Sequence, residues 1–130
     1  MRTKKLLEMY SAFALITCVN FMLVPRFWIV LYGGAPEPQA IFLYRLMATL
    51  FGAVGLMTWL ARLAEPSESR LAMIRGLAVG NVLATLVATL GAVTNVYNEF
   101  AWGPVVTFAL FSLGFVQASR SERAPVAVGA

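Results

Sequence analysis

Few side chains in this chain of 130 residues could carry chemistry. Histidine and aspartate are absent, and Cys18 is the only cysteine. Without imidazoles the chain cannot ligate haem or a metal through histidine, nor use histidine in acid–base catalysis. A single thiol forms neither an internal disulfide nor a CxxC redox pair. We therefore expect no catalytic residue, no metal site and no cofactor, and a protein that is not an enzyme.

The first candidate for a functional residue is Arg45, the single charge inside the apolar stretch Ala40–Arg62. An ionisable residue in a membrane-spanning helix marks a functional site by default. At a rise of about 1.5 Å per residue, Arg45 lies roughly 7–8 Å from the start of that stretch. A long arginine side chain can reach the membrane surface from this depth, so two interpretations stay open: a buried charge, or a side chain that extends to the interface.

Other polar residues lie at the same expected depth as Arg45, near the outer ends of the helices. Because polar groups inside a membrane normally pair, we predict one hydrogen-bonded cluster there, with an Arg45–Glu99 ion pair at its centre. Its members are Asn20, Tyr44, Arg45, Asn95 and Glu99, with Asn98 close by. Three interpretations stay open: a structural staple between helix ends, a site for a small ligand or lipid headgroup, or unconnected surface residues.

Four apolar runs supply the elements that position these residues. Each run is long enough to cross a hydrocarbon core of ~30 Å, so the sequence predicts an all-α, integral-membrane four-helix bundle that forms one domain over residues 1–130. The aromatic segment Phe27–Tyr32 is expected to lie at the membrane interface between helices 1 and 2, since Trp and Tyr prefer the headgroup level. The expected helices cover about 6–24, 40–62, 71–95 and 101–119, followed by a loose tail over 120–130.

The composition agrees with this class of protein. Hydrophobic residues make up 60% of the chain and charged residues 12%, whereas about a quarter of the residues of a soluble domain are charged. The net charge is +4, but the ten Lys and Arg residues lie at helix ends rather than in one patch. We therefore expect the lipid bilayer as a partner, and no nucleic acid.

The basic residues also predict an orientation. Eight of the ten fall on one side of the predicted topology, and only Arg26 and Arg45 belong to the other side. Positive residues mark the cytoplasmic face. The sequence therefore predicts a multi-pass protein of the bacterial inner membrane with both termini in the cytoplasm. The eight residues are Arg2, Lys4, Lys5, Arg62, Arg70, Arg75, Arg120 and Arg123.

Small residues recur at helical spacing, which favours close packing of helices in lipid. The third apolar run carries a row in which each member follows the last by four residues, and the second run carries Gly52. Asn81, near the middle of the third run, is expected to form an interhelical hydrogen bond. The row could pack inside one bundle, or face a second copy or another membrane subunit. It consists of Gly76, Gly80, Ala84, Ala88 and Ala92.

Taken together, several of these motifs resemble small bacterial four-span proteins of the DoxX-like and related families. The motifs are Tyr44-Arg45-Leu46, the glycine-containing run 50–55, Trp59–Arg62, Gly80-Asn81, and Asn95 followed by Trp102. The resemblance implies a four-helix inner-membrane bundle. Some DoxX relatives are linked to quinone-coupled sulfur oxidation or act as partners of redox enzymes. No catalytic motif of theirs has a counterpart here.

These observations predict a non-enzymatic inner-membrane protein that serves as an accessory or structural subunit of a larger membrane complex, or that self-associates. The alternative is a protein that binds or transports a small lipophilic molecule, such as a quinone or a lipid, at the outer polar cluster. A third interpretation, implied by the resemblance, is a DoxX-type redox partner.

Overall fold

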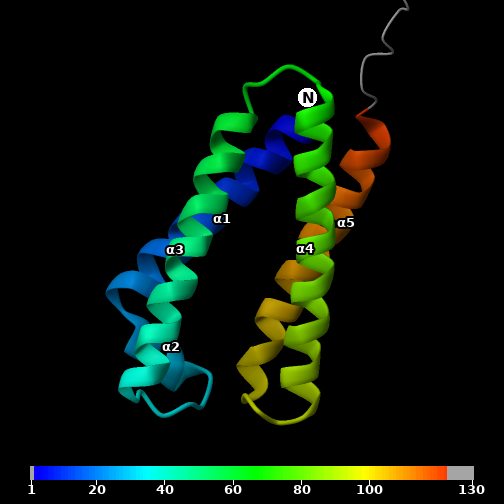
Figure 1. Cartoon of the computed structure of the whole chain (residues 1–130). Coiled ribbons are helices and arrows are strands. Elements are labelled where there is room, and N and C mark those ends of the chain that lie inside the picture. Colours follow the sequence, from blue (N-terminus) through cyan, green and yellow to red (C-terminus); the bar gives the residue numbers. More distant parts are fainter. Residues whose placement is uncertain (1, 123–130) are drawn as a thin grey trace, which may run out of the picture.

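The computed structural model describes residues 2–122, and every regular element in that part of the chain is helical (Figure 1). Two of the elements are short: α2, which follows the first long helix directly, and the 3₁₀ helix η1. In chain order the elements are α1 (Arg2–Leu23), α2 (Pro25–Leu31), α3 (Pro38–Ala61), α4 (Glu68–Val93), η1 (Glu99–Ala101) and α5 (Trp102–Ser121).

Four of the helices are long and apolar enough to cross a membrane: α1, α3, α4, and the segment Glu99–Ser121 that contains α5. The 24 residues of α3 extend over about 36 Å at the usual rise per residue, which exceeds the ~30 Å of a hydrocarbon core. Residues 2–122 are therefore all-helical, and their four long apolar helices indicate a multi-pass membrane protein. This finding confirms the helical fold class and the membrane class.

The helices extend beyond several of the expected bounds. The first was expected from residue 6 and begins at Arg2, and the last continues through Ser121 instead of ending at 119. Apolar runs mark only the part of a helix that lies in lipid, whereas the backbone can keep its hydrogen bonds through a charged turn at the surface. The rest of the expected loose tail, residues 123–130, lies outside the described residues.

Local sequence signals explain where the helices begin. Pro25 and Pro38 occupy the first turns of α2 and α3, where a missing N–H costs no helical hydrogen bond. Ser67 caps α4, because its side-chain oxygen accepts a hydrogen bond from the backbone N–H of Arg70 over 3.2 Å, the usual role of serine at this position.

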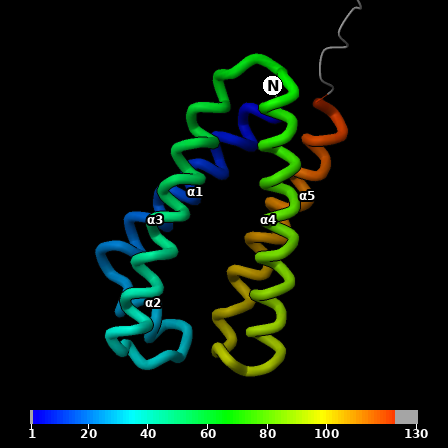
Figure 2. The backbone as a smooth tube through the Cα atoms, viewed as in Figure 1, coloured from blue at the N-terminus to red at the C-terminus, as the bar shows by residue number. Residues whose placement is uncertain are grey.

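The long helices form two antiparallel pairs, α1 with α3 and α4 with α5, and most inter-helix contacts lie within these pairs. Figure 2 shows the two pairs side by side, with α1 crossing behind toward α5. The start of α1, the α3–α4 connection and the end of α5 lie together at what we call the N-terminal end (Figure 1). The opposite end, here the far end, carries α2 and the α4–α5 turn.

The first pair is held by close backbone approach. A Cβ atom added to Gly55 would lie 2.9 Å from Cγ of Leu15, and one added to Gly52 would lie 3.0 Å from Sγ of Cys18. The buried hydroxyl of Ser11 donates a hydrogen bond to the carbonyl oxygen of Gly55 over 2.7 Å. Gly52 therefore lies where α3 approaches α1.

The two pairs meet in a hydrophobic core near the N-terminal end. The ring of Tyr10 packs edge to face on Phe111 and Phe115, with centroids 4.8 and 5.0 Å apart. The buried part of the core thus joins α1 to α4 and α5, and Val54 of α3 packs against it. Its buried members are Leu7, Tyr10, Ile74, Ala78, Phe115 and Ala118.

Candidate functional site

The structure does not assemble the outer polar cluster as one site. Arg45 and Glu99 are both exposed and form no ion pair with each other. The amide of Asn20 donates to Ile16 of its own helix over 2.8 Å. A shared depth does not bring side chains together unless they also point toward one another. Both ion pairs found within residues 2–122 lie at the N-terminal end: Glu8–Arg62 and Arg70–Glu122.

Two further members of the expected cluster have other local surroundings. Asn95 has a φ of +55° in the turn that follows α4, a left-handed conformation that asparagine adopts more readily than most residues. The ring of Tyr44 packs on Phe21 at 4.8 Å between centroids. Asn95 is therefore placed by the needs of a turn, and Tyr44 by aromatic packing against α1.

At the far end, Asn98 links the α4–α5 turn to the end of α2. The sequence placed this residue close to the expected polar cluster. Its side-chain amide donates to the carbonyl oxygen of Leu31 over 2.7 Å, and its backbone N–H donates to the carbonyl oxygen of Tyr32 over 3.1 Å. We call Leu31, Tyr32 and Asn98 the far-end clasp. Gly33 makes it possible, because its φ of +84° turns the chain directly beside Asn98, a conformation open to glycine at little cost.

The clasp also has an aromatic component. Tyr32 and Tyr97 approach to 6.1 Å between ring centroids, and burial raises the pKa of the Tyr32 hydroxyl above its usual value. A raised pKa keeps this phenol neutral throughout the physiological range. The clasp therefore joins α2 to the α4–α5 turn without any charge.

Replacing Asn98 with aspartate should lower the free energy of unfolding by about 1–2 kcal/mol, because a carboxylate cannot donate to Leu31. Asparagine and aspartate both accept the hydrogen bond from the N–H of Phe100 that caps η1 over 3.2 Å, so the cap is kept. Reversible unfolding in mixed detergent micelles measures the change. Asn98→Ala, which removes both bonds, should cost more than Asn98→Asp; a loss confined to Asn98→Ala would assign the effect to the cap alone.

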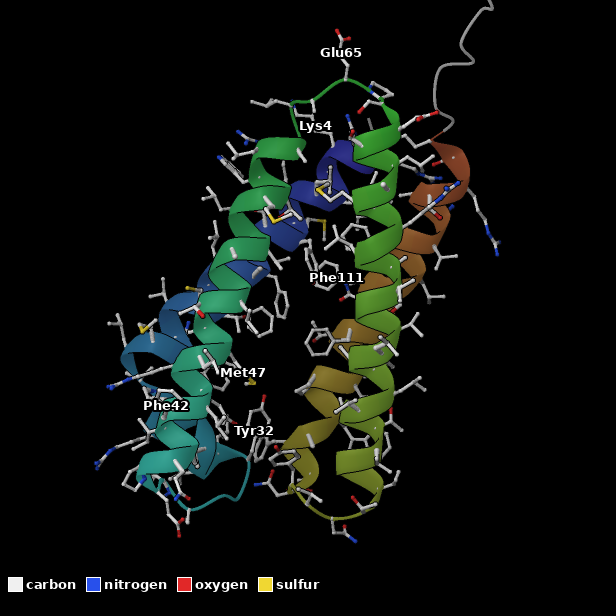
Figure 3. The ribbon with its side chains drawn as sticks, in the orientation of Figure 1. Lys4, Tyr32, Phe42, Met47, Glu65 and Phe111 are labelled. Atoms are coloured by element: carbon white, nitrogen blue, oxygen red, sulfur yellow. The ribbon has the colours of Figure 1, made fainter. Side chains whose placement is uncertain are left out.

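A cleft of about 490 Å³ lies beside the hydrophobic core and shares Tyr10 with it. Its walls are α3 and α4, while Tyr10 and Phe108 contribute from the other two long helices. Figure 3 shows Tyr32, Met47 and Phe111 between the two helix pairs, but none of these three residues lines the cleft. The cleft is lined by Tyr10, Phe51, Val54, Met57, Thr58, Met73, Gly76, Leu77, Gly80, Asn81, Ala84 and Phe108.

Small residues of α4 create this space. The lining residues of α4 recur at i, i+3, i+4, i+7, i+8 and i+11 from residue 73, which places them on one face of the helix. Gly76 and Gly80 lie on that face, and a Cβ atom added to either would meet no atom within 4 Å. The close helix packing expected of these two glycines is therefore not made by residues 2–122, because the face they share borders the cleft instead.

Asn81 is the polar centre of the cleft and is only 2% exposed. Its amide nitrogen donates to the carbonyl oxygen of Leu77 over 2.8 Å and to the hydroxyl of Tyr10 over 3.3 Å. The second bond is the interhelical hydrogen bond expected of this residue. Its Oδ1 atom is buried and has no hydrogen-bond partner among the described residues. Turning the amide over would set two carbonyl oxygens against each other at Leu77.

An unpaired buried acceptor is costly, at about 1–3 kcal/mol. Thr58, the other buried polar residue of the cleft, donates to backbone carbonyls of its own helix at 2.9 and 3.0 Å. Asn81 and Tyr10 therefore provide the polar groups through which this otherwise apolar cleft could hold a ligand. The sequence predicted the interhelical hydrogen bond of Asn81, but it could not show that Oδ1 is left without a partner among residues 2–122.

Metal binding has no support in the same part of the chain. Within residues 2–122, no three His, Cys, Asp or Glu side chains gather closely enough to hold a metal ion. The thiol of Cys18 packs against Gly52.

Comparison of this chain with protein-family models, with curated proteins and with solved structures finds no match. The resemblance to DoxX-like proteins therefore stays a prediction, and the chemistry of the cleft has to be derived from its own residues.

Proposed function

We propose that this protein is a non-enzymatic protein of the bacterial inner membrane that binds a small lipophilic molecule in the cleft between α3 and α4. The observation that carries the proposal is the buried Oδ1 of Asn81, which lines an apolar cleft and has no hydrogen-bond partner among residues 2–122. A buried acceptor without a hydrogen bond raises the free energy of the folded protein. A ligand that donates a hydrogen bond to this acceptor would remove that cost. The proposed site thus lies in the middle of the protein, away from the outer polar residues.

The dimensions and lining of the cleft support this function. Its volume of about 490 Å³ falls within the range of small-molecule pockets, which are mostly apolar with a few placed polar groups. Gly76 and Gly80 are exposed along its edge, so that the cleft is open between two neighbouring helices. A lipophilic molecule could enter through this opening directly from the bilayer.

For the orientation, we propose that both termini lie in the cytoplasm. Eight of the ten basic residues were expected on one side of the membrane, and the segments that carry seven of them lie at the N-terminal end of the structure (Figure 1). The eighth, Arg123, lies outside the described residues. The positive-inside rule places such an end in the cytoplasm. The far end, with α2 and the clasp, would then face the periplasm.

The test uses a substitution that fills the cleft. Gly80→Leu should abolish ligand retention, because the new side chain would extend from an unobstructed Cβ position into the space that the ligand needs. The measurement is native mass spectrometry of protein extracted gently from its own membrane. We expect a bound species of a few hundred daltons on the wild type (the size class that fits such pockets) and its near-complete loss in the variant.

Gly103→Leu provides the matched control. A Cβ atom at Gly103 also meets nothing within 4 Å, but this glycine lies at the start of α5 and outside the cleft. The control should keep the bound species. Equal occupancy in wild type, Gly80→Leu and Gly103→Leu would overturn the proposed binding site.

A second candidate function is that of an accessory subunit, with a helix of another membrane protein or of a second copy placed in the cleft. The row of small residues favours it, because Gly76 and Gly80 present an exposed, unobstructed face and small residues allow close helix approach in lipid. The same spectra separate the two functions. A stoichiometric polypeptide lost in Gly80→Leu would support the accessory role, and a small molecule would support the first proposal.

A further inference from the structure

The hydrogen-bonding groups in the cleft define the chemical group that a ligand must present. Asn81 has two amide hydrogens, and both are used, toward Leu77 and Tyr10. Its Oδ1 still accepts no hydrogen bond from the described residues. The hydroxyl of Tyr10 accepts one bond from Asn81, and among residues 2–122 it donates no hydrogen bond of its own. Both residues line the cleft. Oδ1 of Asn81 exposes less than 1 Å², so a small shift of this side chain would bring one free acceptor, next to one free donor, to a ligand.

A single hydroxyl group satisfies both. Its hydrogen can be donated to Oδ1 of Asn81, and its lone pairs can accept the hydrogen of Tyr10. The two protein side chains are already hydrogen-bonded to each other, at 3.3 Å, so that one ligand oxygen can lie within reach of both. The carbonyl oxygen of a ketone, or the oxygen of an ether, only accepts and would leave Oδ1 unpaired.

We propose that the ligand of the cleft is a lipophilic alcohol or phenol, recognised through its hydroxyl group by Asn81 and Tyr10. The inference rests on the proposed function, because it names the ligand class of the same cleft. Apolar walls contribute affinity without distinguishing an alcohol from its ether, whereas the unpaired Oδ1 does distinguish them. Leaving that acceptor unpaired should reduce affinity roughly 10- to 100-fold.

The test compares two probes of nearly equal shape, farnesol and farnesyl methyl ether, which differ in the hydroxyl hydrogen. The full-length protein is placed in phospholipid nanodiscs, and its unfolding temperature is followed against the mole fraction of each probe in the bilayer. A ligand that binds only the folded state raises that temperature in proportion to its saturation. For the wild type we expect at least ten-fold tighter binding of farnesol.

Two variants show which protein atoms cause the preference for farnesol. Asn81→Leu removes the free acceptor, so the preference for farnesol should fall to about three-fold or less while both probes still bind. Tyr10→Phe keeps the ring in the aromatic core and keeps Oδ1, so both affinities should fall modestly and the preference should remain. Asn20→Leu is the matched control, because Asn20 has the same amide bond to its own helix and lies outside the cleft; its preference should equal that of the wild type.

The outcomes separate this inference from the proposed function. A preference for farnesol that Asn81→Leu abolishes supports the inference. Equal binding of both probes to the wild type, blocked by Gly80→Leu, would overturn the hydroxyl requirement and leave the binding cleft in place. Binding of neither probe would overturn both proposals. Because the wild-type ratio is the primary result, the test stands even if a variant fails to fold.

Discussion

Replacing Phe115 with alanine should lower the free energy of unfolding by about 3–5 kcal/mol, the usual cost of deleting a buried aromatic side chain. Phe115 is fully buried, and its ring packs against Tyr10 of α1 from its own helix α5. This contact belongs to the core that joins the two helix pairs. The loss should therefore appear as separation of the pairs as well as reduced stability.

Reversible unfolding by SDS in mixed micelles measures the change in free energy. Phe42→Ala is the matched control, since Phe42 is 66% exposed and points away from the other helix pair (Figure 3). We expect its effect to stay within about 0.5 kcal/mol, as for surface substitutions generally. Similar losses for the two phenylalanines would show that the core at the N-terminal end does not hold the pairs together.

The second large effect concerns the ion pair between Arg70 and Glu122. Nη2 of Arg70 lies 3.0 Å from Oε1 of Glu122, and each side chain is 9% exposed. Arg70 also donates to the carbonyl oxygen of Ala64. Glu122→Ala should destabilise the protein by about 3 kcal/mol, because it leaves the guanidinium buried without its counter-charge.

A double variant separates charge from packing. Replacing Arg70 with methionine and Glu122 with leucine together removes both charges, and this should recover most of the stability lost in the single variant. Glu8→Ala is the matched control: Glu8 is 3.6 Å from Arg62 and 39% exposed, so its loss should cost below about 1 kcal/mol. Equal costs for Glu8→Ala and Glu122→Ala would contradict a buried pair.

The number and class of the helices could be predicted because both are local properties. A run of about twenty apolar residues must form a helix in lipid, where every backbone polar group needs an internal partner. Likewise, prolines and serine at the helix starts act through their immediate neighbours, as Ser67 does for Arg70. Only the exact helix ends differ from the prediction, because charged residues outside the lipid, such as Arg2, continue the helix.

The polar site could not be predicted in the same way. Arg45, Asn20 and Glu99 share an expected depth, but depth along a helix leaves open the direction in which each side chain points. The residue that does join the far ends, Asn98, bonds to backbone carbonyls of α2 and its C-terminus, and such acceptors are present at every residue of a sequence. A hydrogen bond from a side chain to a distant backbone carbonyl can be identified only once the tertiary structure is known.

The sequence by itself determined four apolar spans, the charge asymmetry between their ends, and the absence of histidine and aspartate. Tertiary structure alone decided that Gly76 and Gly80 border a cleft rather than a neighbouring helix. It also decided that Oδ1 of Asn81 has no hydrogen-bond partner in the described part of the chain. The physical reason lies in the solvent. In lipid, a residue facing the bilayer is as apolar as one facing another helix, so hydrophobicity cannot say which faces meet, and the packing of the two helix pairs decides it.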